Sequence, residues 1–407
     1  MIRLSNYFLG AIACCLGLLA CNKSMQKADA GNILHEKPGK ANAGNIPPGQ
    51  MLSISKTVNI GMPKVQLYQD TVYSAVNMGA SLFRPLPDGY DNQIVSFRLP
   101  KGYMVVFAEN SDGTGESECY IAIDGAIGGN LPERLRNKIS YIRYIPIDNP
   151  DKKGTAAVKA DVVQTFAAQW YYNWGLGANS YPGQQYVPMT WSKWACNNAN
   201  ISALVEKNNI SHLLSFNEPD NKDQSNIPNI DTAVSRYLLM QKTGLRLGSP
   251  VTTQDQAKGD GRWLTRFMAK AKEENARIDF VAVHWYDWGN QFNNRPTDSL
   301  TAEAVFNRFK FYMGKVHEAY PDKKIWVTEF NANVNRTSTV VHEYFMKLST
   351  EWMNSTDYVE RYSYFFPKPV PATNADGSLT EAGAYWQSLP SSKAFSGNIV
   401  SADTELF

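Results

Sequence analysis

Residues 211–220 read SHLLSFNEPD, an apolar stretch that ends in polar residues. Positions 212–216 are mostly apolar, which is typical of a strand buried on both faces in a parallel sheet. The strand has to end near Asn217 and Glu218, because Pro219 lacks the backbone N–H that a central strand needs. The stretch therefore predicts a buried parallel strand with an amide and a carboxylate at its carboxyl end.

The same pattern of a short apolar run followed by a helix-like segment recurs across residues 153–390. The strand-like runs are 169–174, 187–191, 212–217, 245–249, 280–286, 325–330 and 361–366, with a weaker eighth run near 154–157. The helix-like segments include 198–208, 230–243, 261–275, 302–320 and 340–353. So long an alternation favours an α/β fold, and a closed (β/α)8 TIM barrel over an open doubly wound sheet.

Residues 52–148 have a different pattern and predict a small all-β domain of the Greek-key sandwich type. Short alternating runs separated by Gly, Pro, Asp and Asn occur at 65–68, 94–99, 104–107, 119–123 and 139–145. Two halves of this region are weakly similar, and such paired copies resemble the βγ-crystallin-type domain. In calcium-binding members of that group an Asn/Asp pair followed by a serine supplies ligands. Asp91, Asn92 and Ser96 keep part of that pattern, with ordinary turn chemistry as the alternative.

The first residues have the features of an export signal. An apolar run from 7 to 20 follows Arg3 and is too short for a membrane span, so 1–20 predicts a signal peptide. The sequence before Cys21 resembles the lipobox of bacterial lipoproteins, which implies acylation of Cys21 and attachment to the outer membrane, at its periplasmic face or the cell surface. The alternative is an ordinary signal peptide cut near Ala20. Residues 21–51, rich in Lys, Asn, Gly and Ala, predict a flexible tether.

The composition limits the classes of partner and cofactor. With 40 Lys+Arg against 38 Asp+Glu, nothing indicates a nucleic-acid partner. The histidines show no paired metal-ligand spacing, and no glycine-rich phosphate loop follows a strand, so no metal in the catalytic domain and no nucleotide cofactor is expected. Once Cys21 is acylated and the signal peptide removed, only Cys119 and Cys196 remain, which predicts no disulfide framework. We expect a monomer with a neutral ligand.

Two glutamates stand at the carboxyl ends of predicted strands. Glu218 ends the fourth strand and Glu329 the seventh, and active sites of (β/α)8 barrels are built at that end. Two carboxylates at one mouth suit glycosidic bond cleavage, because the reaction needs a proton donor and an anion facing the reacting carbon. Asn217 could hydrogen-bond a sugar hydroxyl beside them. The alternative is that both are solvated carboxylates or helix caps.

Aromatic residues gather at the same strand ends, and flat side chains make stacking platforms for sugar rings. A tryptophan at or beyond a strand's carboxyl end is expected to point at the mouth, although each aromatic residue could instead belong to the core. The candidate substrate contacts are Asn173, Trp191, His284, Trp285, Tyr286 and Trp288. Residues 288–296 predict a long loop beside the cleft. Asp220 and Asp287 lie just past strand ends and are expected to order loops, and Asp279 lies at the opposite end of its strand.

The motifs FNEPD, LGSPV, FVAVHWY and WVTEF, preceded by WYYNWG and VPMTW, occur in this order on successive predicted strands. They resemble those of glycoside hydrolase family 128, a clan A family, over about 153–390. The resemblance implies a retaining endo-β-1,3-glucanase with Glu218 as acid/base and Glu329 as nucleophile, whose carboxyl groups would be about 5 to 5.5 Å apart. It departs from the family at Ser215, where members commonly have glycine. Two alternatives stay open: hydrolysis of another β-glycan such as mannan, xylan or β-1,4-glucan, and a non-catalytic glycan-binding lipoprotein.

Overall fold

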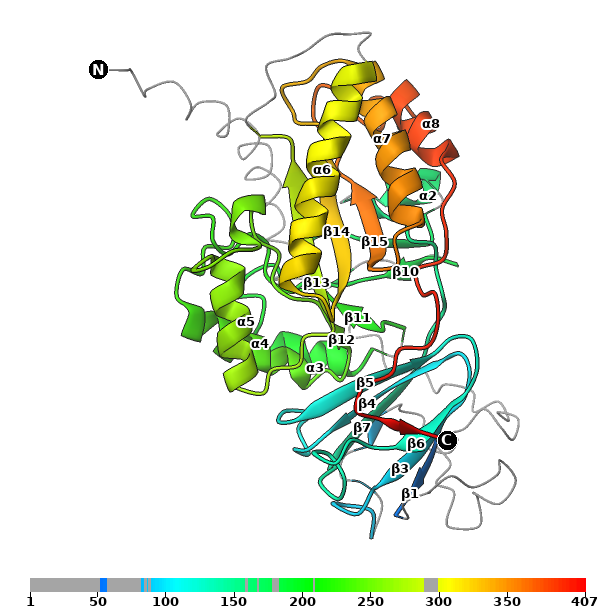
Figure 1. Cartoon of the computed structure of the whole chain (residues 1–407), viewed down its shortest axis with the longest axis vertical. Helices are drawn as coiled ribbons and strands as arrows, with labels where there is room; N and C mark the ends of the chain where they lie inside the picture. The colour runs from blue at the N-terminus through cyan, green and yellow to red at the C-terminus, as the bar shows by residue number, and fades with distance from the viewer. Residues whose placement is uncertain are drawn as a thin grey trace. The chain divides into compact units, whose positions relative to one another are not determined.

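The computed structural model describes residues 52–56, 82–83, 86, 89–157, 160–166, 168–177, 183–207, 209–288 and 299–407. All of them belong to one compact unit that begins at Ala43. The fold is a mixed α/β fold, as the sequence predicts, with parallel strands and helices from about residue 153 onward and antiparallel sheets before it (Figure 1). The predicted signal peptide, Cys21, the tether and the strand-like run at 65–68 lie outside the described residues.

The parallel strands fall into three sheets that are linked by single bridges. The sheets have the orders β10-β9-β8, β11-β12 and β13-β14-β15, and every pair in them is parallel. Further parallel bridges join Met189 to Leu214, Gly248 to Phe280, and Lys153 to Tyr362. The bounds are β8 Thr155–Ala156, β9 Trp170–Tyr172, β10 Gln185–Tyr186, β11 His212–Leu213, β12 Arg246–Leu247, β13 Phe280–Tyr286, β14 Lys324–Asn331 and β15 Val359–Tyr364.

Helices alternate with these strands and cover them with apolar faces. In α5, for example, Trp263, Leu264, Phe267 and Ala271 are buried, the spacing of one helical face. Figure 1 shows α6 and α7 packed side by side across β13, β14 and β15. The helices are α2 Ala160–Phe166, α3 Asn198–Val205, α4 Ile230–Gln241, α5 Trp263–Glu273, α6 Ser299–Ala319, α7 Thr339–Asn354 and α8 Glu381–Ser388, with a 3-10 turn η2 at Gln254–Gln256. The structure adds α2 and α8 to the five segments expected from sequence. Among the described residues, no helix combines the length and apolarity needed to cross a bilayer.

The space between the parallel strands contains buried charges as well as aromatic rings. Trp326 stacks on Phe280 with ring centroids 4.1 Å apart, and the Arg361 guanidinium lies 4.4 Å from the Trp326 ring centroid. Arg246 and Glu360 form a bidentate ion pair in which both side chains are almost fully buried. The carboxylate partly compensates two buried guanidinium charges, so this pair is part of the core.

Two antiparallel sheets, β1-β3-β6-β16 and β2-β7-β4-β5, are formed by the N-terminal part of the described chain together with the C-terminal strand β16. Their bounds are β1 Ser53–Ser55, β2 Leu82–Phe83, β3 Ser96–Leu99, β4 Tyr103–Ala108, β5 Ser117–Ala122, β6 Ile127–Asn130, β7 Tyr141–Pro146 and β16 Glu405–Leu406. The two similar sequence halves meet reciprocally, because Asn92 N bonds Ile139 O at 3.0 Å and Asn137 N bonds Ile94 O at 2.9 Å. Both asparagines have positive φ, which asparagine tolerates better than most residues.

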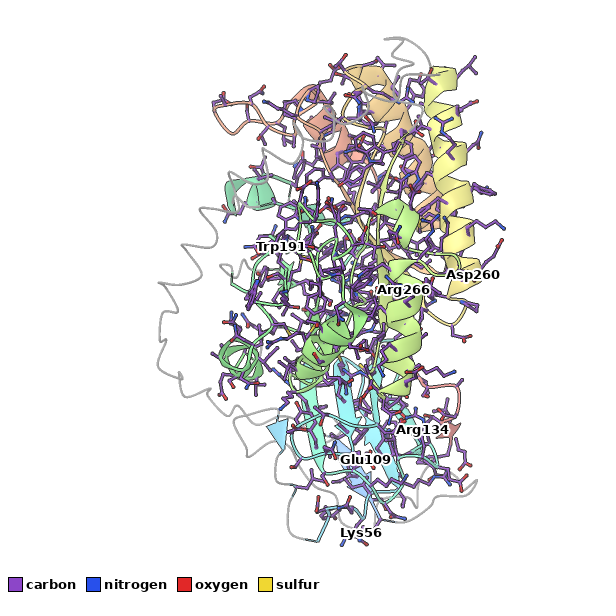
Figure 2. The ribbon with its side chains drawn as sticks, turned by 90° about the vertical axis from the view of Figure 1, so that its left-hand side faces the viewer. Lys56, Glu109, Arg134, Trp191, Asp260 and Arg266 are labelled. Carbon is purple, nitrogen blue, oxygen red and sulfur yellow. The ribbon has the colours of Figure 1, made fainter. Side chains whose placement is uncertain are left out.

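The sheet containing β4, β5 and β7 packs against the amino-terminal ends of the parallel strands. Arg143 donates to Lys207 O at 2.5 Å and to Thr243 O, and the Tyr141 hydroxyl donates to Lys242 O at 3.1 Å. These carbonyls lie just past the ends of α3 and α4, where backbone oxygens lack helical partners. In Figure 2, Glu109 and Arg134 mark the antiparallel sheets and Trp191 the α/β part.

Candidate active site

The two predicted glutamates lie on opposite sides of one imidazole ring. His284, in β13, has Nδ1 hydrogen-bonded to Glu218 Oε1 at 3.0 Å, and its Nε2 lies 3.4 Å from Glu329 Oε1. The second contact does not have hydrogen-bond geometry, so Nε2 forms only an electrostatic contact with Glu329. Only 13% of the Glu218 side chain and 6% of the Glu329 side chain are exposed. The two carboxylates therefore lie on either side of His284 and are largely shielded from solvent.

A bulge in β14 turns Glu329 toward this pocket. Val283 pairs with Val327, yet the next residue, His284, pairs with Glu329, so Thr328 is an extra residue on β14. A bulge changes which face the following side chain points to. Trp326 and Glu329 therefore both face the space between the strands, although they are an odd number of residues apart.

Three side chains donate hydrogen bonds to Glu329. Oε1 accepts from Trp174 Nε1 at 2.9 Å and shares the single Tyr172 O–H, at 3.3 Å, with Thr328 O at 3.0 Å, and Oε2 accepts from the Tyr286 hydroxyl. Burial and then the charge of Glu329 raise the pKa of Tyr172 and of Tyr286 well above the usual value. Both phenols are therefore protonated at neutral pH and act as hydrogen-bond donors.

Glu218 is held mainly through its backbone. Its φ of +43° is in the left-handed region, where non-glycine residues are uncommon. Its N–H donates to Val251 O at 2.6 Å, and its Oε2 accepts from Asn221 Nδ2 at 3.1 Å. The bond to Val251, in the loop after β12, holds this unusual backbone conformation in place, and such conformations are common at functional sites.

The charge of the imidazole follows from its neighbours. Burial alone lowers the pKa of His284, but the charge of Glu329, the hydrogen bond that His284 donates to Glu218 and the charge of Glu218 outweigh burial and raise the pKa above its usual value. A protonated His284 donates from Nδ1 to Glu218 and carries its positive charge next to Glu329. The imidazolium lowers the repulsion between the two glutamates.

The two predicted asparagines differ in availability. Asn217 is 5% exposed and donates to Gln224 Oε1 at 3.3 Å, while its own Oδ1 is buried and has no hydrogen-bond partner among the described residues. Both polar atoms of the Asn173 side chain already have partners within the protein. Its Oδ1 accepts from the Tyr186 hydroxyl at 2.8 Å, and its Nδ2 donates to Gly177 O at 3.1 Å. Asn217 is therefore the better candidate for binding a hydroxyl group.

The three predicted tryptophans have three different positions. Trp285 is only 3% exposed and packs on Phe309 of α6 and Phe345 of α7, so its prediction as a sugar platform is wrong. Its strand neighbours face the carboxylates, and alternation along β13 turns Trp285 to the helices. Trp191 is half-buried next to Asn217, whose N–H donates to Trp191 O at 3.0 Å. Trp288 is 39% exposed just past β13, and most of the predicted loop at 288–296 lies outside the described residues.

Three nearby aspartates have structural partners. Asp220 accepts from Thr253 N at 3.0 Å, and Asp287 accepts from Arg308 and Arg336 at 2.7 and 2.6 Å. These contacts confirm that both order loops. Asp279 lies at the start of β13, at the end remote from Glu329, and accepts from Leu247 N at 2.6 Å.

Sequence reasoning missed Trp174 and Tyr172 as partners of Glu329. Both lie in the strand-like run 169–174, and their contacts with Glu329 identify them. Tyr172 faces the site by strand alternation in β9, a signal present in the sequence. Trp174 reaches the site because its φ is +58°. No pattern in the sequence around this tryptophan predicts a positive φ.

The calcium candidates do not form a compact set of ligands. Ser96 lies in β3 with its side chain buried, whereas Asp91 is exposed. The Asn92 side chain donates to Asp91 at 3.3 Å and accepts from Ser140 at 3.4 Å. Across the described residues, no group of three or more His, Cys, Asp or Glu side chains could hold a metal ion. These residues fit ordinary turn chemistry better than a calcium site.

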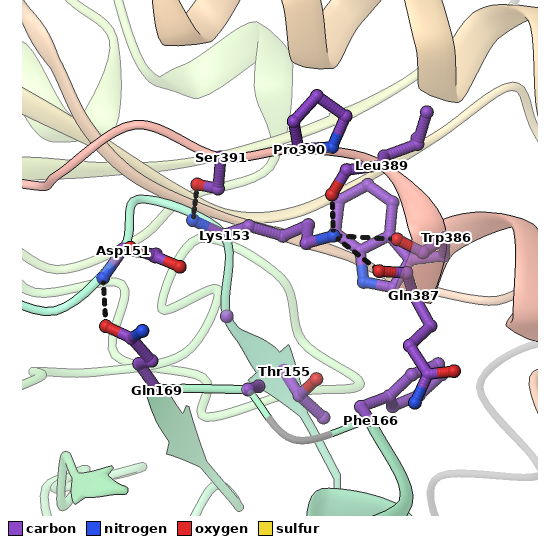
Figure 3. Close-up of a pocket in the computed structure, with 12 residues that line it drawn as sticks. Asp151, Lys153, Thr155, Phe166, Gln169, Trp386, Gln387, Leu389, Pro390 and Ser391 are labelled. Atoms are coloured by element: carbon purple, nitrogen blue, oxygen red, sulfur yellow. Dashed lines mark hydrogen bonds between the residues drawn. The ribbon is translucent and has the colours of Figure 1, made fainter. Parts of the chain in front are cut away.

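A cavity of about 310 Å³ lies at the other end of the parallel strands (Figure 3). Lys153 precedes β8 and donates from Nζ to Trp386 O and Gln387 O at the end of α8, while Asp151 N donates to Gln169. Burial lowers the pKa of Lys153 to about 8. None of the residues around Glu218 and Glu329 lines this cavity, which is therefore separate from the carboxylate site.

Comparison with known proteins shows similarity to glycoside hydrolases. A structure of a family 128, subgroup I endo-β-1,3-glucanase variant from Amycolatopsis mediterranei with laminarihexaose is 26% identical, with a TM-score of 0.51, and covers 59% of this chain and all of that chain. The same enzyme with laminaritriose is 27% identical, with a TM-score of 0.50, and covers 58% of this chain and 98% of that chain.

Alkali-sensitive linkage protein 1 of Schizosaccharomyces pombe is 28% identical over 239 residues, which are 53% of this chain and 39% of that protein. This chain therefore matches well under half the length of that relative. The family model described as the glycosyl hydrolase catalytic core matches residues 151–386, which include both glutamates. Because this match spans more than half of the 407 residues, the chain belongs to the glycosyl hydrolase catalytic core family.

Proposed function

We propose that this protein is a retaining endo-β-1,3-glucanase with Glu218 as acid/base and Glu329 as nucleophile. The observation that carries the proposal is the pair of carboxylates on either side of His284, one of them held by three hydrogen-bond donors. The substrate is inferred from the Amycolatopsis enzyme, an endo-β-1,3-glucanase solved with laminari-oligosaccharides. The match covers nearly the whole length of that enzyme's chain.

The reaction needs the two glutamates to begin in different protonation states. A carboxylate oxygen of Glu329 attacks the anomeric carbon while the carboxylic acid of Glu218 gives its proton to the glycosidic oxygen. The bond between that carbon and oxygen breaks, one sugar chain leaves as an alcohol, and the other is held on Glu329 as an ester. Water then attacks the same carbon, Glu218 takes the proton of the water, and Glu329 leaves as a carboxylate. One water is consumed and the anomeric configuration is retained.

The surrounding residues support this division of roles. Tyr172, Trp174 and Tyr286 all donate to Glu329, which favours its anionic form before attack. His284 is almost fully buried and can rotate little, and in the form that starts the reaction the proton between its Nδ1 and Glu218 Oε1 lies on the glutamate, so the neutral imidazole accepts from Glu218. The unpartnered Oδ1 of Asn217 is available to accept a bond from a sugar hydroxyl next to the reacting carbon.

We propose a closed (β/α)8 barrel as the framework of this site. The parallel pairs and bridges can be followed in the order β8, β9, β10, β11, β12, β13, β14 and β15, and the bridge of Lys153 to Tyr362 leads back to β8. In that arrangement both glutamates stand at the carboxyl ends of strands, the usual place for active sites in such barrels. The antiparallel sheets, with their reciprocal asparagine bonds, support an N-terminal domain of the βγ-crystallin type.

Product analysis tests the function. Purified protein is incubated with laminarin, curdlan, mannan and xylan, and the released sugars are separated by size. We expect oligosaccharides from the β-1,3-glucans, with NMR showing that the first product is the β-anomer. Glu329→Gln, which keeps the shape of the side chain, is the control and should lose nearly all activity. Cleavage of only mannan or xylan would refute β-1,3-glucan as the substrate. Binding of laminarin without any cleavage would refute the proposal that the protein is an enzyme.

The reaction as proposed uses only protein carboxylates and water. We therefore propose that it needs no cofactor, and that the protein acts as a monomer on a neutral polysaccharide. Treatment with EDTA should leave the rate of laminarin hydrolysis within twofold, and recovery of a lost activity by calcium would contradict this.

We also propose that residues 1–20 direct export and that Cys21 carries a lipid anchor at the outer membrane. The sequence before Cys21 supports this proposal. Growth with a labelled fatty acid should label the wild-type protein and leave Cys21→Ser unlabelled and released from the membrane fraction. Labelling of the variant would show that Cys21 is not the acceptor.

A further inference from the structure

Three residues connect the loops that follow β11 and β12 with the end of β13 without touching either catalytic carboxylate. Asp220 accepts two hydrogen bonds from Thr253, one from its backbone N–H at 3.0 Å and one from its hydroxyl. The neighbour of Thr253, Gln254, accepts from the backbone N–H of Tyr286 with its side-chain oxygen at 2.9 Å. We name Asp220, Thr253 and Gln254 the loop bridge.

Each end of the loop bridge adjoins one of the two glutamates. Asp220 is two residues after Glu218, in a loop whose backbone is also bonded to the loop after β12 through Val251. At the other end, Tyr286 donates its hydroxyl to Glu329. A continuous series of short contacts therefore runs from the acid/base to the nucleophile through the loop after β12.

We propose that Asp220, Thr253 and Gln254 are positioning residues that hold the acid/base and the nucleophile at the separation required for double displacement. The inference rests on the proposed function. Retaining enzymes need their carboxyl groups about 5 to 5.5 Å apart. A displacement of about 1 Å can reduce the rate about a hundredfold, so loops that carry the two groups need a mutual constraint.

The two acceptor oxygens of Asp220 suit a residue that links two loops better than one that only fills space in its own loop. A carboxylate can accept from both the N–H and the O–H of Thr253, whereas an asparagine side chain offers only one oxygen. Burial raises the pKa of Asp220, although the bonds from Thr253 oppose this. The charge of the partly buried Asp220 also acts on His284, whose pKa it helps to raise. The loop bridge thus combines a geometric and an electrostatic link to the site.

A pair of threonine variants separates positioning from stability. Thr253→Val removes the hydroxyl bond to Asp220 and keeps the backbone bond. Thr243→Val is the control, because the Thr243 hydroxyl also takes part in hydrogen bonds, donating to Met240 O and accepting from Leu245 N, but lies at the remote ends of the strands. On laminarin we expect Thr253→Val to lower kcat about tenfold with KM within twofold. Thr243→Val should leave both constants within twofold, and Thr253→Ser should restore kcat.

The outcomes are distinguishable from failure of the proposed function. If wild-type protein cleaves no β-1,3-glucan, the proposed function fails before any variant is compared. If wild type is active and the two valine variants lower kcat equally, or Thr253→Val keeps full kcat, the positioning role is rejected. Circular dichroism melting of each variant shows that it is folded at the assay temperature.

A measurement without substrate tests the electrostatic link. NMR titration of the His284 imidazole in wild type and in Asp220→Asn compares the same shape with and without the charge. We expect a lower titration midpoint in Asp220→Asn, because a nearby negative charge favours the imidazolium. An unchanged midpoint would remove the electrostatic part of the proposal.

Discussion

The indole N–H of Trp174 donates to Glu329: Trp174 Nε1 lies 2.9 Å from Glu329 Oε1. This contact requires the positive φ of Trp174, and the residue is almost buried. A strained backbone that delivers one donor to a carboxylate indicates that the donor matters for the state of that carboxylate.

Trp174→Phe removes this donor and keeps most of the ring. We expect kcat on laminarin to fall about 10- to 100-fold, because a hydrogen bond to a charged group contributes about 1.5 to 3 kcal/mol. KM should change less than kcat. Steady-state kinetics measures both constants, and a variant with kcat within twofold of wild type would show that Trp174 only fills space.

His284 gives the stability of the protein a pH dependence. Its folded pKa is raised above the ordinary value of 6.5. The folded state therefore holds this proton more tightly than the unfolded state, so the stabilisation is complete below pH 6.5 and is lost as pH rises through the folded pKa. We expect the free energy of unfolding in urea to exceed that of His284→Gln by more at pH 6 than at pH 9. Equal differences at both pH values would contradict the raised pKa.

We expect the free energy of unfolding to fall when Glu360, the buried partner of Arg246, loses its charge. Glu360→Gln keeps the shape but leaves Arg246 and Arg361 buried without a negative partner, and breaking such a pair costs about 3 to 5 kcal/mol. Glu351→Gln is the control, since Glu351 forms an exposed pair with Lys347 and should change stability by less than about 1 kcal/mol. Urea denaturation measures both, and similar losses in the two variants would refute the expectation.

Gly154 has no room for a side chain. A Cβ at this position would lie 2.1 Å from Trp170, whereas a Cβ at Gly314 in α6 would meet nothing within 4 Å. Gly154→Ala is expected to destabilise the protein by at least about 1 to 3 kcal/mol through overpacking. Gly314→Ala should stabilise by up to about 1 kcal/mol, because alanine is the better helix former. Thermal unfolding compares them, and a Gly154→Ala variant as stable as wild type would show that Trp170 can move.

The sequence predicted the elements of the α/β part because their apolar runs and helical faces are strongly periodic. It also placed Glu218 and Glu329 together, since strand ends of one fold gather at one edge. The prediction for Trp285 was wrong because it rested on the position of the residue near the strand end. Side chains alternate between the two faces of a strand, so Trp285 points to the opposite face from His284. The bulge at Thr328 is equally invisible in sequence, because it depends on how β13 and β14 pair.

The antiparallel part shows a second limit of sequence reasoning. The strands β3, β4, β5 and β7 fall within two or three residues of the expected runs, but β16 was not expected at all. A two-residue exposed strand carries too few residues for a periodic signal. Its place next to β6 depends on contacts such as Asn130 with Glu405.

The pairing of β16 with β6 has a consequence for the order of folding. Asn130 and Glu405 are separated by 275 residues, so a ribosome releases the whole α/β part before it releases the strand that completes this sheet. Until then the backbone groups along one edge of β6 have no partner, and such an edge is a site of mispairing between nascent chains. Contacts this distant in sequence also form slowly, so the sheet is expected to be among the last parts of the molecule to mature.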